Sequence, residues 1–382
     1  MRIAIDARTI CDAGGGPGAG IEHYTQAVLT HLVRRHPRDA FLVFVPPSLT
    51  MEGHRALAEG RANVRVLTLP ARPPIVGRQI LMPLIALAWR ADVLFCPTPH
   101  LPALWPRPSV IAVHDLSIFR HPEWFPAQDA AGLSTRRLVP RALRRATRIV
   151  AVSDFAARQA GDMVPGAFAK VDVVPPGVRV PAEVSGTDRF EIPGEFVLCL
   201  GTVEPRKNVE AAIAAFGRFL ADHPERAYKL RLVLAGKWGW KTEGPEAAMR
   251  EANKRWRMEA PDGVVRATGP VTEEEKWELL SRAAALMMSS WEEGFGLPAL
   301  EAMALGVPVI ASDRGALPDV VGDAGFLCAP EDVEEMALLL AQVLLMPEAV
   351  VSVAEAGAAR AAAFTWEATA DGVMEALRKA IR

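Results

Sequence analysis

The sequence predicts an α/β protein with two doubly wound parallel-sheet domains in tandem. Along its 382 residues, short runs rich in valine and isoleucine alternate with segments of helical spacing, which is typical of parallel sheets with helices on both faces. Pro175-Pro176-Gly177 and the turn-rich stretch 181–194 interrupt the alternation and predict a linker. A second alternating series follows, and the length suits two or three domains of ~150 residues each.

Apolar runs bounded by turn residues are the expected strands. In the first series they include Ile3–Ile5, Phe41–Val45, Val64–Leu67, Val93–Cys96, Val110–Val113, Ile149–Val152 and Val171–Val174. In the second they are Phe196–Leu200, Arg231–Ala235, Val264–Ala267, Ala285–Met288, Val307–Ala311 and Gly325–Leu327. The expected helices between them include Ile21–Val33, Thr135–Ala146, Val209–Leu220 and Val333–Leu345.

These elements predict an N-terminal domain over residues 1–178 and a C-terminal domain over 179–362. Parallel sheets bind ligands at the carboxyl ends of their strands, so two such domains facing each other form a cleft for a site. Two domains that are joined by a single linker need a second connection between them. We therefore expect the amphipathic segment within 363–382 to cross back onto the N-terminal domain.

Composition excludes several classes of protein. Half of the residues are apolar and 23% are charged, which is typical of globular proteins and not of disordered ones. The apolar stretch Ile80–Trp89 contains Pro83 and is shorter than the ~20 residues of a membrane-spanning helix. The N-terminus lacks the apolar core of a signal peptide. The cysteines stand singly, at Cys11, Cys96, Cys199 and Cys328, so we expect no zinc site, no disulfide framework and a cytoplasmic location.

Charge divides unevenly between the two halves. Residues 1–180 hold 22 basic and 13 acidic side chains, a net charge of +9, and residues 181–382 hold 21 and 32, a net charge of −11. Such an asymmetry indicates that the first half meets an anionic partner. The alternative is a drift in surface composition without function.

Two loops have the composition of anion-binding turns. The glycine-rich loop Gly14–Gly20 precedes a helix, whose N-terminus favours an anion, although it matches neither the dinucleotide-binding nor the P-loop pattern. In Gly201–Asn208, Arg206 and Lys207 stand at the start of the next helix, where the helix dipole disfavours cations. A bound polyanion would resolve that conflict. The alternatives are a flexible surface loop and a solvated turn.

Polar residues also follow two other expected strands. Glu293 and Glu301 flank a glycine-lined helix start in Glu293-Gly294-Phe295-Gly296-Leu297-Pro298-Ala299-Leu300-Glu301, and carboxylates suit neighbouring sugar hydroxyls because each oxygen accepts hydrogen bonds. His114-Asp115 ends the strand Val110–Val113; a structural histidine is the alternative there. The sequence contains no Asp-x-Asp pair, no HExxH and no Gly-x-Ser-x-Gly, which leaves no obvious metal clamp or nucleophile.

Taken together, these residues resemble the retaining GT-B glycosyltransferases of family 4, over nearly the whole chain. Glu293-x7-Glu301 with its intervening Gly-Phe-Gly-Leu-Pro matches the EX7E element, and the match continues through 305–312. The turn 201–208 is similar to the family's phosphate-binding turn, and 113–115 to its histidine site; Ala151-Val152-Ser153 also fits. The stretch from His114 to Glu123, together with the Pro205-Arg206-Lys207-Asn208 turn, is similar to bacterial mannosyl- and related transferases that build surface polysaccharides.

The resemblance implies two Rossmann-like domains and hexose transfer from a nucleotide diphosphate sugar, with GDP-mannose as the first candidate donor. It implies a glycan or lipid-linked acceptor, retention at the sugar carbon, and no metal or other cofactor. The residues with implied roles, named by what they contact, are Gly20 (donor diphosphate), His114 (donor sugar), Arg206 and Lys207 (leaving diphosphate), Glu293 with the amides of Phe295, Gly296 and Leu297 (sugar hydroxyls and phosphate), Glu301 (ribose), and Asp115 and Ser153 (substrate).

Two positions depart from the family. Many members have an arginine where Thr202 stands, and Arg206 is the candidate substitute; many also have an arginine where His23 stands.

Other GT-B activities, a nucleotide-sugar epimerase or a phosphorylase, are the alternatives among enzymes. The alternative outside enzymes is a catalytically silent nucleotide-sugar-binding protein. The retained candidate residues argue against it; they are His114, Lys207, Glu293 and Glu301.

An arginine-rich stretch points to a membrane surface. Residues 135–148 hold six arginines, with Leu138, Leu143 and Ala146 as an interleaved packing stripe. Ile80–Trp89 lies in the same basic half. We expect peripheral contact with the anionic inner face of the cytoplasmic membrane; the alternative is a solvated helix face. Nucleic acid is a poorer partner, because the acidic second half would repel it.

Overall fold

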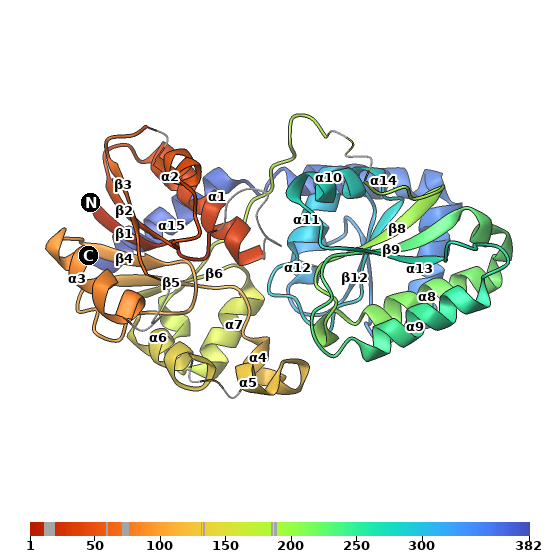
Figure 1. The fold of residues 1–382 in the computed structure, drawn as a ribbon, viewed down its shortest axis with the longest axis horizontal. Helices are drawn as coiled ribbons and strands as arrows, with labels where there is room; N and C mark the ends of the chain where they lie inside the picture. Colours follow the sequence, from red (N-terminus) through yellow and green to blue (C-terminus); the bar gives the residue numbers. More distant parts are fainter. Residues whose placement is uncertain are drawn as a thin grey trace. The chain divides into compact units, whose positions relative to one another are not determined.

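The computed structural model describes residues 1–382 except 11–19, 59, 71–75, 131, 133, 185, 187 and 188. The chain divides into two compact units, each with its own sheet (Figure 1). Unit 1 comprises Met1–Pro122, Ala127–Gly177 and Phe364–Arg382, and unit 2 comprises Glu123–Pro126 and Val178–Ala363. The last helix therefore belongs to the first compact unit, and a four-residue segment of the first half belongs to the second.

Unit 1 is built on a seven-stranded parallel sheet in the order β3-β2-β1-β4-β5-β6-β7. The strands are β1 (Arg2–Asp6), β2 (Ala40–Val45), β3 (Val64–Thr68), β4 (Val93–Cys96), β5 (Ser109–Val113), β6 (Arg148–Ala151) and β7 (Val171–Val173). Central strands such as β5 are buried at every residue, because helices cover both faces of a parallel sheet.

Helices and helical turns connect these strands. They are α1 (Gly20–Arg35), α2 (Met51–Ala58), η1 (Val76–Leu81), α3 (Met82–Ala88), α4 (Ser117–Arg120), η2 (Pro122–Trp124), α5 (Ala127–Ala130), η3 (Ser134–Leu138), α6 (Val139–Arg145), α7 (Asp154–Met163) and η4 (Phe168–Lys170). The final helix α15 (Trp366–Ile381) packs against α1. Its N-cap Thr365 accepts a hydrogen bond from the Ala368 amide, and Arg35 on α1 forms an ion pair with Asp371 on α15.

Unit 2 is built on a six-stranded parallel sheet in the order β10-β9-β8-β11-β12-β13. The strands are β8 (Glu195–Leu200), β9 (Leu230–Ala235), β10 (Val265–Gly269), β11 (Ala285–Met288), β12 (Val309–Ser312) and β13 (Phe326–Cys328). The connecting elements are η5 (Pro205–Lys207), α8 (Val209–Asp222), η6 (Pro224–Tyr228), α9 (Glu243–Arg255), α10 (Glu273–Arg282), α11 (Leu297–Ala304), α12 (Leu317–Val321), α13 (Val333–Leu345) and α14 (Pro347–Ala361). The prediction of two parallel-sheet domains is thus confirmed.

Both sheets change winding direction beside their first strand. In unit 1 the chain goes from β1 to β2 and β3 on one side and to β4 on the other; in unit 2, β8 stands between β9 and β11. At such a switch point the two flanking loops leave the sheet in opposite directions, which opens a crevice at the carboxyl ends of the strands. In unit 2 these are the loops after β8 and β11, which contain two of the predicted motifs.

No single helix in the described parts of the chain has both the length and the apolar character needed to cross a membrane. One pair, 333–345 with 350–381, reaches the required length and composition only together, and it is bent by 99°.

Candidate functional site

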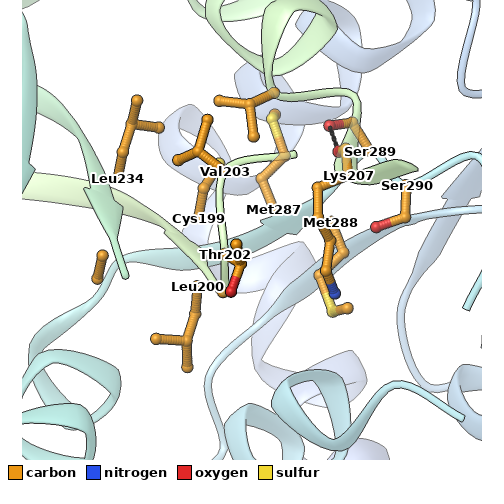
Figure 2. Close-up of a pocket in the computed structure, with 13 residues that line it drawn as sticks. Cys199, Leu200, Thr202, Val203, Lys207, Leu234, Met287, Met288, Ser289 and Ser290 are labelled. Carbon is orange, nitrogen blue, oxygen red and sulfur yellow. Dashed lines mark hydrogen bonds between the residues drawn. The ribbon is translucent and has the colours of Figure 1, made fainter. Parts of the chain in front are cut away.

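The candidate site lies at the switch point of unit 2, where the loops after β8 and β11 meet. The Trp291 amide donates to the Arg206 carbonyl at 2.9 Å. The Ser289 hydroxyl donates to the carbonyls of Lys207 at 3.2 Å and Asn208 at 2.8 Å. Figure 2 shows side chains of both loops lining one pocket at this edge. The two loops therefore form one hydrogen-bonded wall.

Glycine permits the tight packing of this edge. Gly201, directly after β8, has a φ of 139°, and a Cβ at Gly236 would lie 2.0 Å from the Gly201 carbonyl oxygen. No Cβ fits at Gly236, directly after β9, and the positive φ of Gly201 favours glycine directly after β8.

Four charged side chains gather beside the pocket. Lys207 Nζ donates to Glu293 Oε1, and Arg206 donates to Glu293 Oε2 at 2.9 Å. Arg206 also donates to Glu204 Oε1 at 2.8 Å. The Ser290 hydroxyl donates to Glu293 Oε1 at 2.8 Å. With two cations and two carboxylates, this group is neutral before any substrate arrives.

The structure corrects the expected position of the two cations. Arg206 and Lys207 do not begin the long helix; they belong to the short 3-10 turn η5, and α8 starts two residues later, after Asn208 with a φ of 49°. Their conflict with the helix dipole is resolved inside the protein by Glu204 and Glu293. The pair therefore does not by itself require a polyanion.

Glu293 is ionised under all ordinary conditions. Burial alone would raise the pKa of its carboxyl group, but the Lys207 ammonium and the Arg206 guanidinium outweigh burial and lower the pKa to about 2. Gly315 supports the backbone here: its φ is 67°, and a Cβ at that position would lie 2.6 Å from both the amide nitrogen and the carbonyl oxygen of Glu293. The Glu293 carbonyl accepts a hydrogen bond from the Ala316 amide at 2.9 Å.

The helix start after Glu293 has the geometry that the sequence predicts. Gly296 is the N-cap of α11 with a φ of 101°, and Pro298 lies in the first turn. A Cβ on Gly296 would lie 2.6 Å from Leu317 Cδ2, so glycine is required by backbone conformation and by space. Phe295 is buried, and Leu297 is the first residue of α11.

Glu301 has a partner that sequence reasoning did not identify. It is buried on α11, and its Oε1 accepts a hydrogen bond from Lys276 Nζ at 2.6 Å. Lys276 lies in the first turn of α10 and also donates to Glu273 at 2.7 Å. Burial would lower the pKa of Lys276, but Glu301 and Glu273 outweigh burial and raise it. Lys276 was not predictable, because a lysine in a helical pattern is an ordinary surface residue.

In unit 1, His114 follows β5 and is held by its neighbours. Its Nε2 lies 2.8 Å from the Pro97 carbonyl, and its ring meets the Tyr24 ring edge-on at 4.6 Å. A carbonyl can only accept, so Nε2 carries the proton and Nδ1 of the neutral ring is an acceptor. Burial lowers the pKa of His114 despite the hydrogen bond to Pro97. The imidazole is therefore neutral at pH 7.

Other predicted residues of unit 1 have local structural contacts. Asp115 accepts a hydrogen bond from the Ser117 amide at 2.6 Å. Ser153 is the N-cap of α7 and accepts from the Ala156 amide. Gly20 is the first residue of α1, and the rest of the predicted Gly14–Gly20 loop lies outside the described residues. His23, one of the two departures, packs edge-on against Trp366.

The switch point of unit 1 holds a charged group that sequence reasoning missed. Arg8 donates to both oxygens of Asp6 at the end of β1, at 2.7 and 2.8 Å. Arg78 Nε lies 3.6 Å from Asp6. The Asp-Ala-Arg sequence directly after a strand is the signal that could have indicated this group. Within the described residues, no cluster of three or more His, Cys, Asp or Glu side chains is arranged to hold a metal ion.

Family comparisons account for both halves of the chain. The family described as "Glycosyltransferase Family 4" matches residues 18–180, and that described as "Glycosyl transferases group 1" matches residues 189–360. The O-antigen chain mannosyltransferase B of Escherichia coli is 31% identical over 271 residues, which are 68% of this chain and 67% of that protein.

The chain belongs to the family 4 (group 1) glycosyltransferases. A D-inositol 3-phosphate glycosyltransferase of Segniliparus rotundus is 34% identical over 224 residues, 56% of this chain. That alignment spans 48% of the relative's length, so the chain matches about half of that protein.

Solved structures agree on the fold of this glycosyltransferase. Anabaena Alr3699/HepE, solved in complex with UDP and glucose, has a TM-score of 0.69 at 19% identity, with 99% of both chains covered. WaaG, described as a glycosyltransferase involved in lipopolysaccharide biosynthesis, has a TM-score of 0.70 at 14% identity, covering 98% of this chain and 99% of WaaG. Both likenesses place the enzyme among the GT-B glycosyltransferases by fold.

Proposed function

We propose that this glycosyltransferase moves a hexose from a nucleotide diphosphate sugar to a glycan or lipid-linked acceptor, with retention at the sugar carbon and without a metal ion. GDP-mannose is the first candidate donor, because two relatives from Escherichia coli are named as mannosyltransferases: the O-antigen chain mannosyltransferase B and the serotype-specific mannosyltransferase WbdA. The observation that carries the proposal is the Arg206–Lys207–Glu293 group at the switch point of unit 2.

This group is suited to a leaving diphosphate. An ammonium has three donors, and Lys207 uses one on Glu293, which leaves donors for phosphate oxygens without breaking the ion pair. Arg206 is held in a fixed orientation by Glu204, Glu293 and the Glu292 carbonyl. Fixed cations stabilise charge that develops on the departing phosphate more than they stabilise the bound donor, and this difference lowers the barrier.

The remaining roles follow from the donors and acceptors available. The amides at the start of α11 are directed out of the helix N-terminus, where sugar hydroxyl oxygens or a phosphate can accept their hydrogen bonds. Neutral His114 offers Nδ1 to a substrate hydroxyl. We propose that the acceptor hydroxyl attacks the sugar carbon from the face that the diphosphate leaves, and that a departing phosphate oxygen takes the hydroxyl proton. We assign Glu293 to binding and not to covalent catalysis, since its ion pairs with Lys207 and Arg206 make both of its oxygens weaker nucleophiles.

A donor screen tests the proposal. The protein is incubated with GDP-mannose, UDP-glucose, UDP-N-acetylglucosamine or dTDP-rhamnose, with and without a lipid-diphosphate-linked saccharide, and product and free nucleotide are quantified. Transfer from one donor, lost in Lys207→Met, is expected. Sugar interconversion without acceptor would indicate an epimerase, and sugar transfer to inorganic phosphate a phosphorylase. Nucleotide-sugar binding without any turnover would indicate a silent binding protein.

We further propose that unit 1 docks on an anionic membrane. Of the six arginines in 135–148, Arg145 donates to the carbonyls of Pro102 and Trp105, and Arg148 forms an ion pair with Asp172. The four others are exposed: Arg136, Arg137, Arg141 and Arg144. The Arg145 contacts join α6 to the segment 102–105, which contains Leu104, an apolar side chain that is 75% exposed. Basic and apolar side chains on one surface are typical of peripheral membrane binding.

Co-sedimentation with vesicles tests the docking. Each basic side chain near an anionic surface contributes about 1 kcal/mol at low salt. We expect binding to phosphatidylglycerol-rich vesicles that falls with salt, and that weakens in Arg141→Gln and Leu104→Ser. Arg218→Gln, an exposed arginine of unit 2, is the matched control. Equal binding to neutral vesicles, or none at low salt, would contradict the docking and favour an acceptor in solution.

A further inference from the structure

The charged group at the switch point of unit 1 has an excess of positive charge. Asp6 ends β1 and Cys96 ends β4, and these two strands pair side by side in the sheet (Figure 1). Asp6 is 4% exposed, and Arg8 donates to both of its oxygens. Arg78 adds a second guanidinium near the same carboxylate. Two arginines and one aspartate leave a net charge of +1 at the carboxyl edge, where α/β sheets bind their ligands.

The other titratable groups beside these arginines do not neutralise them. Burial raises the pKa of the Cys96 thiol well above its usual value, so the thiol carries no charge at pH 7. Burial, together with Arg78 and Arg8, lowers the pKa of His100 to about 4, so its imidazole is neutral at pH 7 as well. Within the residues that the structure describes, Asp6 is the one acidic side chain that pairs with either guanidinium. The excess positive charge therefore has no counter-charge in this group.

Arg78 keeps its hydrogen-bond donors for a ligand. Its Nε lies 3.6 Å from Asp6 Oδ2, beyond hydrogen-bond distance, and is buried without a hydrogen-bond partner. Arg78 forms no hydrogen bond with any other residue in the described parts of the chain. Arg8 uses Nε and Nη2 on Asp6, which leaves the donors of Nη1. Unpaired buried donors are costly, and two adjacent guanidiniums are suited to the oxygens of a phosphate or a carboxylate.

Backbone contacts hold Arg78 at this edge of the sheet. It lies in η1, a π-helical turn, and such turns are rare and frequent at functional sites. A Cβ at Gly77 would lie 2.6 Å from a carbonyl oxygen of the segment after β3 and 3.7 Å from Arg8 Nη1. The turn approaches both closely because residue 77 has no side chain. Gln79 Oε1 accepts a hydrogen bond at 2.6 Å from the Ala103 amide, in the segment after β4. The turn that carries Arg78 is thus fixed to the segments that follow two strands.

We propose that Arg8 and Arg78 bind an anionic oxygen group of the acceptor, a phosphate or a carboxylate, so that the enzyme selects charged acceptors over neutral ones. This rests on the proposed function, in which the chain transfers a sugar to an acceptor. The group shares its sheet edge with His114, whose Nε2 contacts the Pro97 carbonyl directly after β4. A neutral acceptor would leave the excess charge unpaired. If water alone covered Arg78, acceptors would not be distinguished by charge.

Matched acceptors test the proposal in solution. One saccharide is prepared on a short alkyl chain in three forms: linked through a diphosphate, linked directly, and linked directly with a uronic acid as its innermost sugar. Short chains keep the acceptor off membranes, which separates this site from membrane docking. With the donor that the screen identifies, kcat/KM should be at least ~10-fold higher for a charged acceptor than for the neutral one, from hydrogen bonds between charged groups. The preferred charged form identifies the bound group as phosphate or carboxylate.

Two variants locate the effect within unit 1. In Arg78→Gln the preference should fall to about 3-fold or less, while kcat/KM for the neutral acceptor changes little. Arg148→Gln is the matched control, because Arg148 is 22% exposed against 29% for Arg78 and begins β6 at the amino edge of the same sheet. Its partner Asp172 keeps an ion pair with Lys379, so this variant should fold and retain the full preference.

A binding measurement separates this site from the phosphate turn of unit 2. Calorimetric titration with the preferred charged acceptor, without donor, should show weaker binding in Arg78→Gln and unchanged binding in Lys207→Met. The reverse pattern would place the anion in unit 2 and overturn the proposal. So would a wild-type kcat/KM that is no higher for either charged acceptor than for the neutral one, or a preference that Arg78→Gln retains. Absence of transfer from every donor to all three acceptors would instead overturn the proposed function.

Discussion

Replacing Lys207 by methionine should selectively weaken binding of a nucleoside diphosphate. Lys207 and Glu293 are both largely buried, with side-chain exposures of 16% and 8%, so solvent screens their charges weakly. The group of Glu204, Arg206, Lys207 and Glu293 is neutral, and loss of Lys207 changes it to −1 beside an incoming diphosphate. A hydrogen bond to a charged group contributes about 1.5–3 kcal/mol, which corresponds to a ~10- to 150-fold rise in Kd.

The assay is calorimetric titration of wild-type protein and Lys207→Met with UDP and UMP, or with GDP and GMP if guanine is the base. The diphosphate should lose affinity and the monophosphate much less, since it lacks the second phosphate group. Lys207→Met/Glu293→Gln restores neutrality and separates loss of the phosphate contact from the effect of leaving Glu293 with Arg206 as its one cationic partner. Lys229→Met, an exposed lysine before β9, is the control. An unchanged preference for diphosphate over monophosphate would refute the reasoning.

Three other predictions concern the same unit. Transfer should continue in EDTA, because Arg206 and Lys207 supply cations where the sequence lacks an Asp-x-Asp pair; a loss of activity that magnesium or manganese restores would contradict this. Gly315→Ala should weaken nucleotide binding indirectly, because the new Cβ would lie 2.6 Å from the Glu293 backbone and displace it. A non-glycine residue held at a positive φ also costs about 1–3 kcal/mol of stability. Gly306→Ala has a similar φ of 70° and open space around it, so nucleotide affinity should stay unchanged there. Finally, the depressed pKa of Glu293 should stabilise the folded protein above pH 4.5, and this contribution should be lost as the pH falls toward 2. The shift corresponds to about 3 kcal/mol, so the urea midpoint of wild-type protein should fall more between pH 7 and pH 3.5 than that of Glu293→Gln; parallel curves would disprove it.

The alternation of apolar runs was sufficient to predict the strands of both sheets, and the EX7E element together with the turn 201–208 and the histidine motif 113–115 was sufficient to predict the family. Both signals are local. A strand buried on both faces must be continuously apolar, as in Val110–Val113, and a helix start with positive φ needs glycine, as at Gly296. Local sequence encodes such requirements directly, because the same few residues satisfy them.

Only the tertiary structure decided which charged side chains meet. Arg206 and Lys207 lie 87 and 86 residues before Glu293, and only the placement of β8 beside β11 brings them together. Lys276 meets Glu301 in the same way, and Ser153, for which the resemblance implies a substrate contact, is also the N-cap of α7. Charge is visible in a sequence, but its neutralisation depends on distances between residues far apart in the chain, because Coulomb interactions act through space. The sequence therefore determined the fold and the family, and strand order determined the electrostatics of the site.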